Sequence, residues 1–554
     1  MVDGRLISFH DGQAFDSNVL RSVTCSYGEN FATVEYKLDG LYNVETDENQ
    51  NYFEIPDTGM ESSEGVPYLP VDGLFVLLPE WSNGYELSIT EEDYTALDGE
   101  YDIAPTPKQI LETQELDDIS PQVNVDIYES DAVFPTSVVQ DLGELRLLNE
   151  KVAHILVKPV RYYPKRKKIE VLTNFKFTLR INTNSSESKV DSTKNLQDLR
   201  PDGIIKDLVV KADEFAQDSQ IDAIRKNFLI ITTDKLEYYM RVFEGVKQND
   251  YDTSIVTVEK IKKKYPSLST ADALRKYIKD ENAKSAISYV LLGGDLQDIP
   301  SALASNDYNP AESKFLSDVF FVTDDINKVP FCSIGRMPVS DGNELYNLCD
   351  FAAYYNRFYT DKRKSAIFTA YYGTEGYIEN KKGIAASSKS KINIIDRYDK
   401  EHTKDELIKA INSGVGFINY RGHGSNSSWQ SSNGIVYSDL PKLKVDRQTP
   451  IVFSIACNNN ALTDPKCLGK GWINAKQAIN YLGASAPSYR TTNNWFDTYI
   501  WEAICSKNIS IVGDIYLYAT VKLYQNYPDK ATTTNIKEYI LLGDPTVNYQ
   551  DSKS

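Results

Sequence analysis

The hydrophobic pattern changes once along the chain, near residue 200. Before that point, short runs of β-branched and aromatic residues are separated by Gly, Pro and Asp, as in β-sheet proteins. In KIEVLTNFKFTLRIN (168–182), every second residue from Val171 to Ile181 has polar neighbours, which is typical of a strand with one buried face. We therefore predict a β-rich N-terminal domain. Its strands are expected at FATVEYKL (31–38), LFVLLP (74–79), YELSIT (85–90), HILVKPVRYYP (154–164) and 168–182.

A polar segment separates this domain from the rest of the chain. TNSSESKVDSTKNLQDLRPDG (183–203) is rich in Ser, Asn and charged residues and has few large apolar ones. Such a composition predicts an exposed linker. We place the N-terminal domain, with this linker at its end, at residues 1–205.

From about residue 220, apolar runs of strand length alternate with segments of helical spacing. The order strand, helix, strand, helix, strand predicts a mainly parallel sheet with helices on its faces. The third strand ends in Gly-Gly-Asp (293–295), at the kind of loop where open α/β sheets carry function. The five predicted elements are KNFLIITT (226–233), 234–249, YDTSIVTVEKI (251–261), 269–284 and ISYVLLGGD (287–295).

The alternation resumes after an interruption. We predict an α/β catalytic region with a first lobe at 206–350 and a second at 351–554, either side by side or as one large sheet. The second lobe has strands at KSAIFTAYYG (364–373), VGFINYRGHG (415–424) and PIVFSIACNNN (450–460), a helix at 404–414, a helix followed by a strand in QAINYLGASAPSYR (477–490), and a final segment at 536–548.

Composition narrows the classes of function. The formal net charge is −19, which argues against nucleic acid and anionic membrane surfaces as partners. No run of about 18 apolar residues is present, so no membrane span is predicted. The first 13 residues lack the basic and apolar regions of a signal peptide. We expect a secreted protein whose signal peptide lies outside this sequence, and a cytoplasmic location stays open.

His423 and Cys457 take equivalent places after two of the predicted strands. The carboxyl ends of adjacent parallel strands meet at one edge of a sheet, so the two side chains are expected within reach of each other. An imidazolium favours the charged thiolate, and the pair can act as nucleophile and general base. Backbone N–H groups of Gly424 and Cys457 would then serve as an oxyanion hole.

The pair also fits roles that involve no chemistry. Cys457 suits a small buried residue and His423 a turn residue. No C-x-x-C pair is present, so zinc is not expected, and a Cys457–Cys467 disulfide would consume the proposed nucleophile. The remaining histidines, His10, His154 and His402, fit ordinary surface, strand or helix-start positions.

Several motifs in order resemble the gingipain family of caspase-like cysteine peptidases. FINYRGHGSNSSW and FSIACNNN are similar to its two catalytic motifs, and YVLLGGDLQDIP, VPFCSIGRMPV, NNWFDTYIWEAI and LLGDPTVNY follow its other landmarks. Upstream, VKPVRYYPKRKKIEVLTNFKFTLRI resembles the gingipain propeptide. The resemblance implies an α/β, caspase-like catalytic domain of two lobes, preceded by a β-rich prodomain that covers the active site until it is cut off.

The resemblance also implies roles for single residues. Cys457 and His423 would be the catalytic dyad, Gly424 the oxyanion donor, and Trp495 an aromatic lining the substrate pocket. The family's His-orienting acid is best matched by Glu375, which is displaced by about three residues. The segment that carries a pocket Asp in arginine-selective members contains only Glu379, which weakens the basis for cleavage after Arg or Lys. Asp497 is a second candidate for pocket charge.

Gingipains bind calcium, and loop carboxylates are suitable Ca²⁺ ligands. The candidate ligands here are Asp295, Asp298, Asp318, Asp324 and Asp325; a solvated acidic face is the alternative. No cofactor is expected for the chemistry itself.

The predicted function is a cysteine endopeptidase made as a zymogen, which acts on proteins or peptides. Its own prodomain would be the inhibitor, released by a cut between about 183 and 226. That window offers basic residues for processing: Lys189, Lys194, Arg200, Lys206, Lys211, Arg225 and Lys226. A catalytically silent scaffold or binding protein and a Cys-His transpeptidase or ligase are the alternative functions.

Overall fold

The chain forms two compact units, and each is described by itself. The first consists of residues 1–108, 117–221 and 524–529, and the second of 109–116, 222–523 and 530–554. The short segment 109–116 therefore lies in sequence within the first unit but belongs to the second, and the segment 524–529 lies within the second but belongs to the first. This computed structural model describes residues 4–9, 20–46, 48–114, 122–183, 203–211, 225–323, 328–357, 361–373, 376–445 and 449–550.

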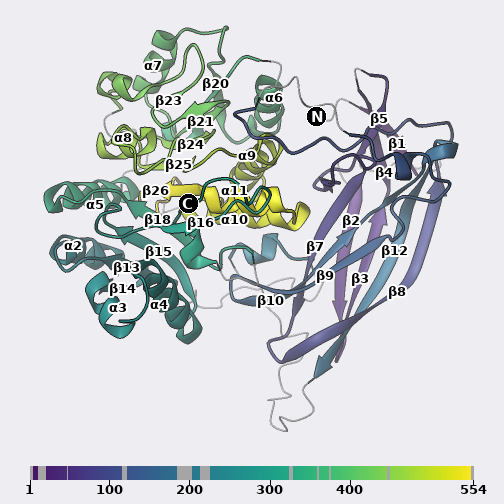
Figure 1. The fold of residues 1–554 in the computed structure, drawn as a ribbon, viewed down its shortest axis with the longest axis horizontal. Helices are drawn as coiled ribbons and strands as arrows, with labels where there is room; N and C mark the ends of the chain where they lie inside the picture. The colour runs from purple at the N-terminus through teal and green to yellow at the C-terminus, as the bar shows by residue number, and fades with distance from the viewer. Residues whose placement is uncertain are drawn as a thin grey trace. The chain divides into compact units, whose positions relative to one another are not determined.

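The first unit is built almost entirely of antiparallel strands (Figure 1). Three sheets have the strand orders β1-β4-β5, β6-β7-β10-β9 and β11-β12-β3-β2, and β8 pairs with β12. The described helix of this unit is the short α1 (Val125–Tyr128). The strands are β1 (Arg5–Ser8), β2 (Arg21–Tyr27), β3 (Phe31–Leu38), β4 (Gly40–Glu45), β5 (Asn51–Glu54), β6 (Gly59–Met60), β7 (Pro70–Leu78), β8 (Ser82–Ala96), β9 (Val139–Leu147), β10 (Glu150–Val157), β11 (Val160–Tyr163) and β12 (Lys168–Thr183).

Strand β12 confirms the alternating pattern read from the sequence. Phe175, Phe177, Leu179 and Ile181 are buried, and the polar residues between them are not. The register against β8 shifts next to Leu172, which is also buried, so the alternation is interrupted there. The predicted linker at 183–203 falls almost wholly outside the described residues.

His154 is an internal residue of this unit. Its Nε2–H donates a hydrogen bond to the carbonyl oxygen of Gln525, at 2.8 Å, and the ring lies 4.7 Å from that of Phe75. Burial lowers the pKa of His154 to about 4, because the charged form would lose its hydration. A neutral, packed imidazole agrees with the prediction that this histidine is an ordinary strand residue.

The second unit has one continuous sheet of ten strands. The order is β14-β13-β15-β18-β26-β25-β24-β21-β19-β20, and Figure 1 shows β14 and β20 at its two ends. Of the two arrangements that the sequence left open, one large sheet is the one observed. The strands are β13 (Asn227–Thr232), β14 (Asp252–Thr257), β15 (Ile287–Gly293), β18 (Ser333–Met337), β19 (Ser365–Ala370), β20 (Asn393–Asp396), β21 (Phe417–Arg421), β24 (Ile451–Ile455), β25 (Asn480–Ala484) and β26 (Tyr539–Leu542); short hairpins are formed by β16 (Ala302–Ala304) with β17 (Phe315–Ser317) and β22 (Gly424–Ser425) with β23 (Ser428–Trp429).

Strand direction reverses once across this sheet. All described neighbours are parallel except β25 and β26, which are antiparallel. The carboxyl ends of β13, β15 and β18 therefore face the edge opposite to those of β19, β21 and β24. The Gly-Gly-Asp loop after β15 begins at the first edge, so its strand end is not shared with the strand ends that carry His423 and Cys457.

The helices begin where the sequence offers caps. Ser269 and Thr257 accept hydrogen bonds from the backbone of α4 and α3, and Thr403 with Glu406 forms a capping box on α7. Helix α6 packs on α9, and α2 packs on α5. The helices are α2 (Glu237–Lys247), α3 (Val258–Lys264), α4 (Thr270–Lys284), α5 (Gly342–Arg357), α6 (Tyr377–Ser388), α7 (Lys404–Asn412), α8 (Leu468–Asn474), α9 (Arg490–Cys505), α10 (Val512–Asn526) and α11 (Lys530–Glu538).

Two sequence-based element assignments are wrong. The run 251–261 is not one strand, because Thr257 caps a helix that begins at Val258. The segment before β25 is not a helix; α8 ends at Asn474, and α9 begins only at Arg490. Both errors come from apolar residues that suit strand and helix equally. Among the described helices, none has the length and apolar character needed to cross a membrane.

Candidate active site

His423 and Cys457 lie at matching positions beyond two neighbouring strands. β21 and β24 are parallel, and their last residues, Arg421 and Ile455, are register partners. Each suspected residue follows two positions later. The two motifs therefore follow neighbouring parallel strands, as predicted.

Gly424 brings the two strand ends into close contact. A Cβ at this position would lie 2.4 Å from the carbonyl oxygen of Cys457, so only glycine allows the observed approach. Asn459 ties the same loops together, because its side chain donates to the carbonyl oxygens of Ser425, at 2.6 Å, and Ser428, at 3.2 Å. The loop after His423 is thereby held against the loop after Cys457.

The imidazole of His423 is half-buried between aromatic rings. Its centroid lies 4.9 Å from that of Tyr371 and 5.7 Å from that of Tyr377, both edge-on. The carbonyl oxygen of His423 accepts hydrogen bonds from the Tyr420 hydroxyl, at 2.8 Å, and the Gln430 N–H, at 3.0 Å. Packing and backbone bonds together restrict the ring to a narrow range of orientations. Glu375, the predicted orienting acid, lies outside the described residues.

The thiol of Cys457 is fully buried and faces Ser488. The backbone N–H of Ser488 donates to Sγ at 3.2 Å, and its hydroxyl lies 3.7 Å away. Burial, followed by the nearby charge of Glu112, raises the pKa of Cys457 to about 12, although the bonds from Ser488 partly oppose the shift. In this state the sulfur is a neutral thiol, which is a poor nucleophile.

Residues 109–114 run beside Ser488 and belong to the same unit as the sheet. The Glu112 N–H donates to the carbonyl oxygen of Ser488, and the Arg490 N–H donates to that of Ile110, both at 2.9 Å. Leu111 and Tyr489 form an antiparallel bridge between these two bonds. The segment therefore binds as an added strand, the way extended peptides bind to an exposed backbone edge.

The side chain of Glu112 fills a pocket of hydrogen-bond donors. One carboxylate oxygen lies 2.5 Å from Arg421 Nη1 and accepts from Asn493 Nδ2 at 3.1 Å. The other accepts from the Tyr377 hydroxyl and lies 3.7 Å from Arg490 Nε. Glu112 and Arg421 both have no exposed surface. Burial opposes the charge of Arg421, but Glu112 outweighs it, so the pKa of Arg421 is raised.

The residues predicted to carry pocket charge lie elsewhere. Asp497 is fully buried in an ion pair with Lys381, which also contacts Asn419. Burial lowers the pKa of Lys381 to about 8, with Asp497 opposing that shift. The structure thus engages Asp497 internally rather than offering it to a substrate. Glu379 is exposed on the first turn of α6, and Trp495 is half-buried on α9.

The described carboxylates do not form the predicted calcium site. Asp318 is paired with the buried guanidinium of Arg336 at 2.7 Å, and Asp295 with Lys470 at 2.7 Å. Asp324 and Asp325 lie outside the described residues. In the part of the chain that the structure describes, no group of three or more His, Cys, Asp or Glu side chains could hold a metal ion. Calcium binding stays a prediction without support from these residues.

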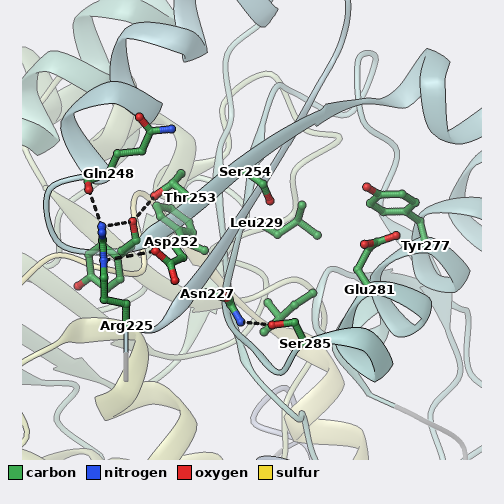
Figure 2. A pocket seen from close by; sticks show the side chains of 13 residues that line it. Arg225, Asn227, Leu229, Gln248, Asp252, Thr253, Ser254, Tyr277, Glu281 and Ser285 are labelled. Atoms are coloured by element: carbon green, nitrogen blue, oxygen red, sulfur yellow. Dashed lines mark hydrogen bonds and ion pairs between the residues drawn. The ribbon is translucent and has the colours of Figure 1, made fainter. Parts of the chain in front are cut away.

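A hollow of about 580 Å³ lies at the other end of the ten-stranded sheet (Figure 2). It is lined by the first residues of β13, β14 and β15, including Asn227, which donates to Ser285 Oγ at 2.6 Å. Strands β18, β26 and β25 separate β15 from β24, the strand that leads to Cys457. This hollow therefore does not belong to the site of Cys457 and His423.

Sequence reasoning missed the residues around Glu112. Arg421 is the last residue of a fully buried strand, and this unusual place for a charge was the available signal. Arg490 and Asn493 lie at the start of α9, and Tyr377 at the start of α6. No local pattern links these positions to Glu112. Even the nearest in sequence, Tyr377, is separated from it by 265 positions.

Comparisons with known proteins match both parts of the chain. The model of Peptidase family C25 matches residues 222–550, and that of Propeptide_C25 matches residues 13–205. Gingipain R2 of Porphyromonas gingivalis is 22% identical over 551 residues, which cover 94% of this chain and 72% of that protein. Gingipain R1 of the same species is 23% identical over 548 residues, covering 93% and 53%.

Solved structures agree with the fold. The crystal structure of the Arg-specific cysteine proteinase gingipain R has a TM-score of 0.53 at 21% identity, over 60% of this chain and 80% of that one. The complex of gingipain pro- and mature domains has a TM-score of 0.52 at 21% identity, over 59% and 80%. The predicted α/β, caspase-like fold with a β-rich N-terminal part is confirmed.

Proposed function

Because the chain belongs to peptidase family C25 and is a cysteine peptidase with a C25 propeptide, we propose that Cys457 is its nucleophile and His423 its general base and acid. The observation that carries this assignment is the shared register of the two residues beyond β21 and β24, with Gly424 packed against Cys457.

The proposed reaction proceeds through an acyl-enzyme. His423 takes the proton from Cys457 Sγ as the sulfur attacks the scissile carbonyl carbon, and the carbonyl electrons move to oxygen. The N–H groups of Gly424 and Cys457 stabilise that oxyanion. The imidazolium then protonates the leaving amine as the C–N bond breaks. In the second half, His423 removes a proton from water, which attacks the thioester and releases the acid.

We further propose that the full-length chain is latent. The added strand at 109–116 lies in sequence within the residues that match the propeptide, and it occupies the edge beside Ser488. The buried thiol, with its raised pKa, is consistent with a resting state. Activation would require this segment to leave, after a cut between about 183 and 226.

The relatives' specificity does not transfer directly. The printed title of one solved relative calls it Arg-specific. In this chain Asp497 is paired with Lys381 and Glu379 is exposed, so neither supplies a free buried anion for a basic side chain.

The test uses wild type, Cys457→Ala and His423→Ala, each as the full chain and after the same limited proteolysis. Cleavage of a peptide library should be lost in Cys457→Ala and reduced at least about 10²-fold in His423→Ala, since a positioned proton carrier contributes that much. Cys467→Ala and Cys505→Ala are the matched controls and should cleave like wild type. Full activity in either dyad variant would refute the assignment. Ligated product after addition of an amine would indicate a transpeptidase instead.

A further inference from the structure

The charges and hydrogen-bond donors of the pocket around Glu112 indicate which kind of side chain it binds. We infer that it is the specificity pocket for the residue before the scissile bond, and that it selects an acidic side chain, so the enzyme cleaves after Glu or Asp. The inference rests on the proposed function of Cys457, and it assigns Glu112 the place of a substrate residue.

The charge balance of the pocket requires an anion. Arg421 has no exposed surface, and Arg490 is nearly buried, with Nε and Nη1 lacking hydrogen-bond partners. Lys381 and Asp497 nearby neutralise each other. Without Glu112, two guanidinium groups would remain buried beside an empty space, which is costly unless a ligand brings negative charge. A Lys or Arg side chain would add a third cation.

The hydrogen bonds distinguish a carboxylate from an amide. The contacts of the Glu112 carboxylate come from Arg421, Arg490, Asn493 and Tyr377, through N–H or O–H groups that can donate. A carboxylate offers two acceptor oxygens to such a set. A Gln side chain would point its own NH₂ at two of these donors and leave the arginines without a counter-charge. A site whose buried donors would be left unpaired discriminates strongly against a ligand that lacks the matching acceptors.

The backbone register connects this pocket to the reacting sulfur. Ser488 accepts from the Glu112 N–H through its carbonyl oxygen and donates to Cys457 Sγ through its own N–H. Glu112 is buried, whereas the side chains of Thr113 and Gln114 are exposed, so among these three residues only Glu112 places its side chain in the pocket. A substrate bound in the same register places its acidic residue in the pocket and the following peptide bond beside the thiol.

The first experiment labels Cys457 in Glu112→Ala after the limited proteolysis described above, so that the added strand can leave and the pocket is empty. Peptidyl acyloxymethyl ketones of Ile-Leu-Glu, Ile-Leu-Gln and Ile-Leu-Arg copy residues 110–112; the sulfur displaces the acyloxy group as a carboxylate and forms a thioether. Mass spectrometry should show the Glu probe reacting at least about 100-fold faster than the other two. Faster labelling by the Arg probe would overturn the inference.

A second substitution tests whether the charge of Arg490 causes the preference for the Glu probe. Arg490→Gln is combined with Glu112→Ala because Arg421 is packed more deeply and its loss endangers folding. It should reduce the ratio of Glu-probe to Gln-probe rates at least about tenfold, since one of the two cations is removed. Arg397→Gln, a change of the same charge outside the pocket, should leave the ratio unchanged. An unaltered ratio in Arg490→Gln would contradict the assignment.

A binding experiment separates this inference from the identity of the nucleophile. The chain with Cys457→Ala and Glu112→Ala, after the same limited proteolysis, is melted with excess acetyl-Ile-Leu-Glu-Thr-amide, or with Gln or Arg in place of Glu. Selective stabilisation by the Glu peptide supports the pocket even if no probe labels Cys457, an outcome that would refute only the proposed nucleophile. Stabilisation by the Arg peptide, or by none of the three, would overturn the acidic specificity.

Discussion

At the scale of single residues, the resting state of the site is set by solvation. Cys457 has no exposed surface, and the closest polar groups all belong to Ser488. The N–H of Ser488 stabilises a thiolate, but burial and the Glu112 charge disfavour it more. In the proposed activation, departure of the segment at 109–116 would remove the Glu112 charge, one of the two effects that disfavour the thiolate.

The raised pKa of Cys457 predicts a pH-dependent alkylation. With a pKa of about 12, the thiolate fraction at pH 8 is on the order of 10⁻⁴. The rate of iodoacetamide labelling at Cys457 in the intact chain should therefore rise about tenfold per pH unit between pH 8 and 11. Mass spectrometry of the Cys457 peptide measures this rate. Fast labelling at pH 7 that does not change with pH would contradict a buried neutral thiol.

At the scale of elements, the site depends on two contacts, one between two strand ends and one between two helices. Gly424 brings the end of β21 against the residue that follows β24. Helices α6 and α9 carry Tyr377 and Arg490, and the buried Lys381–Asp497 pair joins these helices. A substitution at either contact should therefore displace neighbouring site residues that are not themselves substituted.

Gly424→Ala should lower kcat after limited proteolysis by at least about tenfold. The new Cβ would meet the Cys457 carbonyl oxygen at 2.4 Å, so the backbone that carries both reacting residues must shift. Gly383→Ala on α6 is the control, because its Cβ meets nothing within 4 Å. That variant should keep full activity and gain up to about 1 kcal/mol of unfolding free energy. Unchanged turnover in Gly424→Ala would argue against the oxyanion role.

Asp497→Asn should destabilise the fold by about 3–5 kcal/mol, because it leaves Lys381 buried without its anion. Replacing both residues, as Lys381→Met with Asp497→Leu, should cost much less, since neither charge remains. Denaturant unfolding measures the difference. Glu379→Gln, an exposed change on the same helix, should stay within about 0.5 kcal/mol of wild type. A mild Asp497→Asn variant with altered substrate preference would instead favour a role in the pocket.

At the scale of the whole molecule, the chain carries its own substrate-like segment. Residues 109–116 interrupt the β-rich unit, about half of which follows them in sequence, yet they belong to the unit of the ten-stranded sheet. A cut after that unit would sever the chain between the segment and the catalytic residues. The proposed latency and release would then follow from how the chain is divided between its two units.

Incubation of purified wild type and Cys457→Ala side by side tests this arrangement. We expect a new N-terminus between about 183 and 226 in wild type, accompanied by a gain in peptide cleavage, and none in Cys457→Ala. N-terminal sequencing and an activity assay give both results. If processing appears only after another protease is added, the latent state stands but self-activation does not. A full-length chain already at its maximal rate would exclude latency.

Much of the architecture was determined by the sequence alone. Alternating residues in 168–182 specify a half-buried strand, and mainly apolar runs at 415–421 and 451–455 specify buried parallel strands. These patterns are local, so they can be recognised in the sequence without knowledge of the fold. The placement of His423 and Cys457 after two neighbouring parallel strands was also predictable, because each follows an apolar run of strand length.

Only the tertiary structure decided what surrounds the pair. Arg421, Arg490 and Tyr377 converge on Glu112 from three separate elements of the sheet and its helices, and the segment that carries Glu112 is far away in sequence. The internal pairing of Asp497 with Lys381 and the strand reversal between β25 and β26 are likewise contacts between distant residues. A sequence specifies local periodicity directly, whereas the partner of a buried charge is fixed only when the chain closes around it.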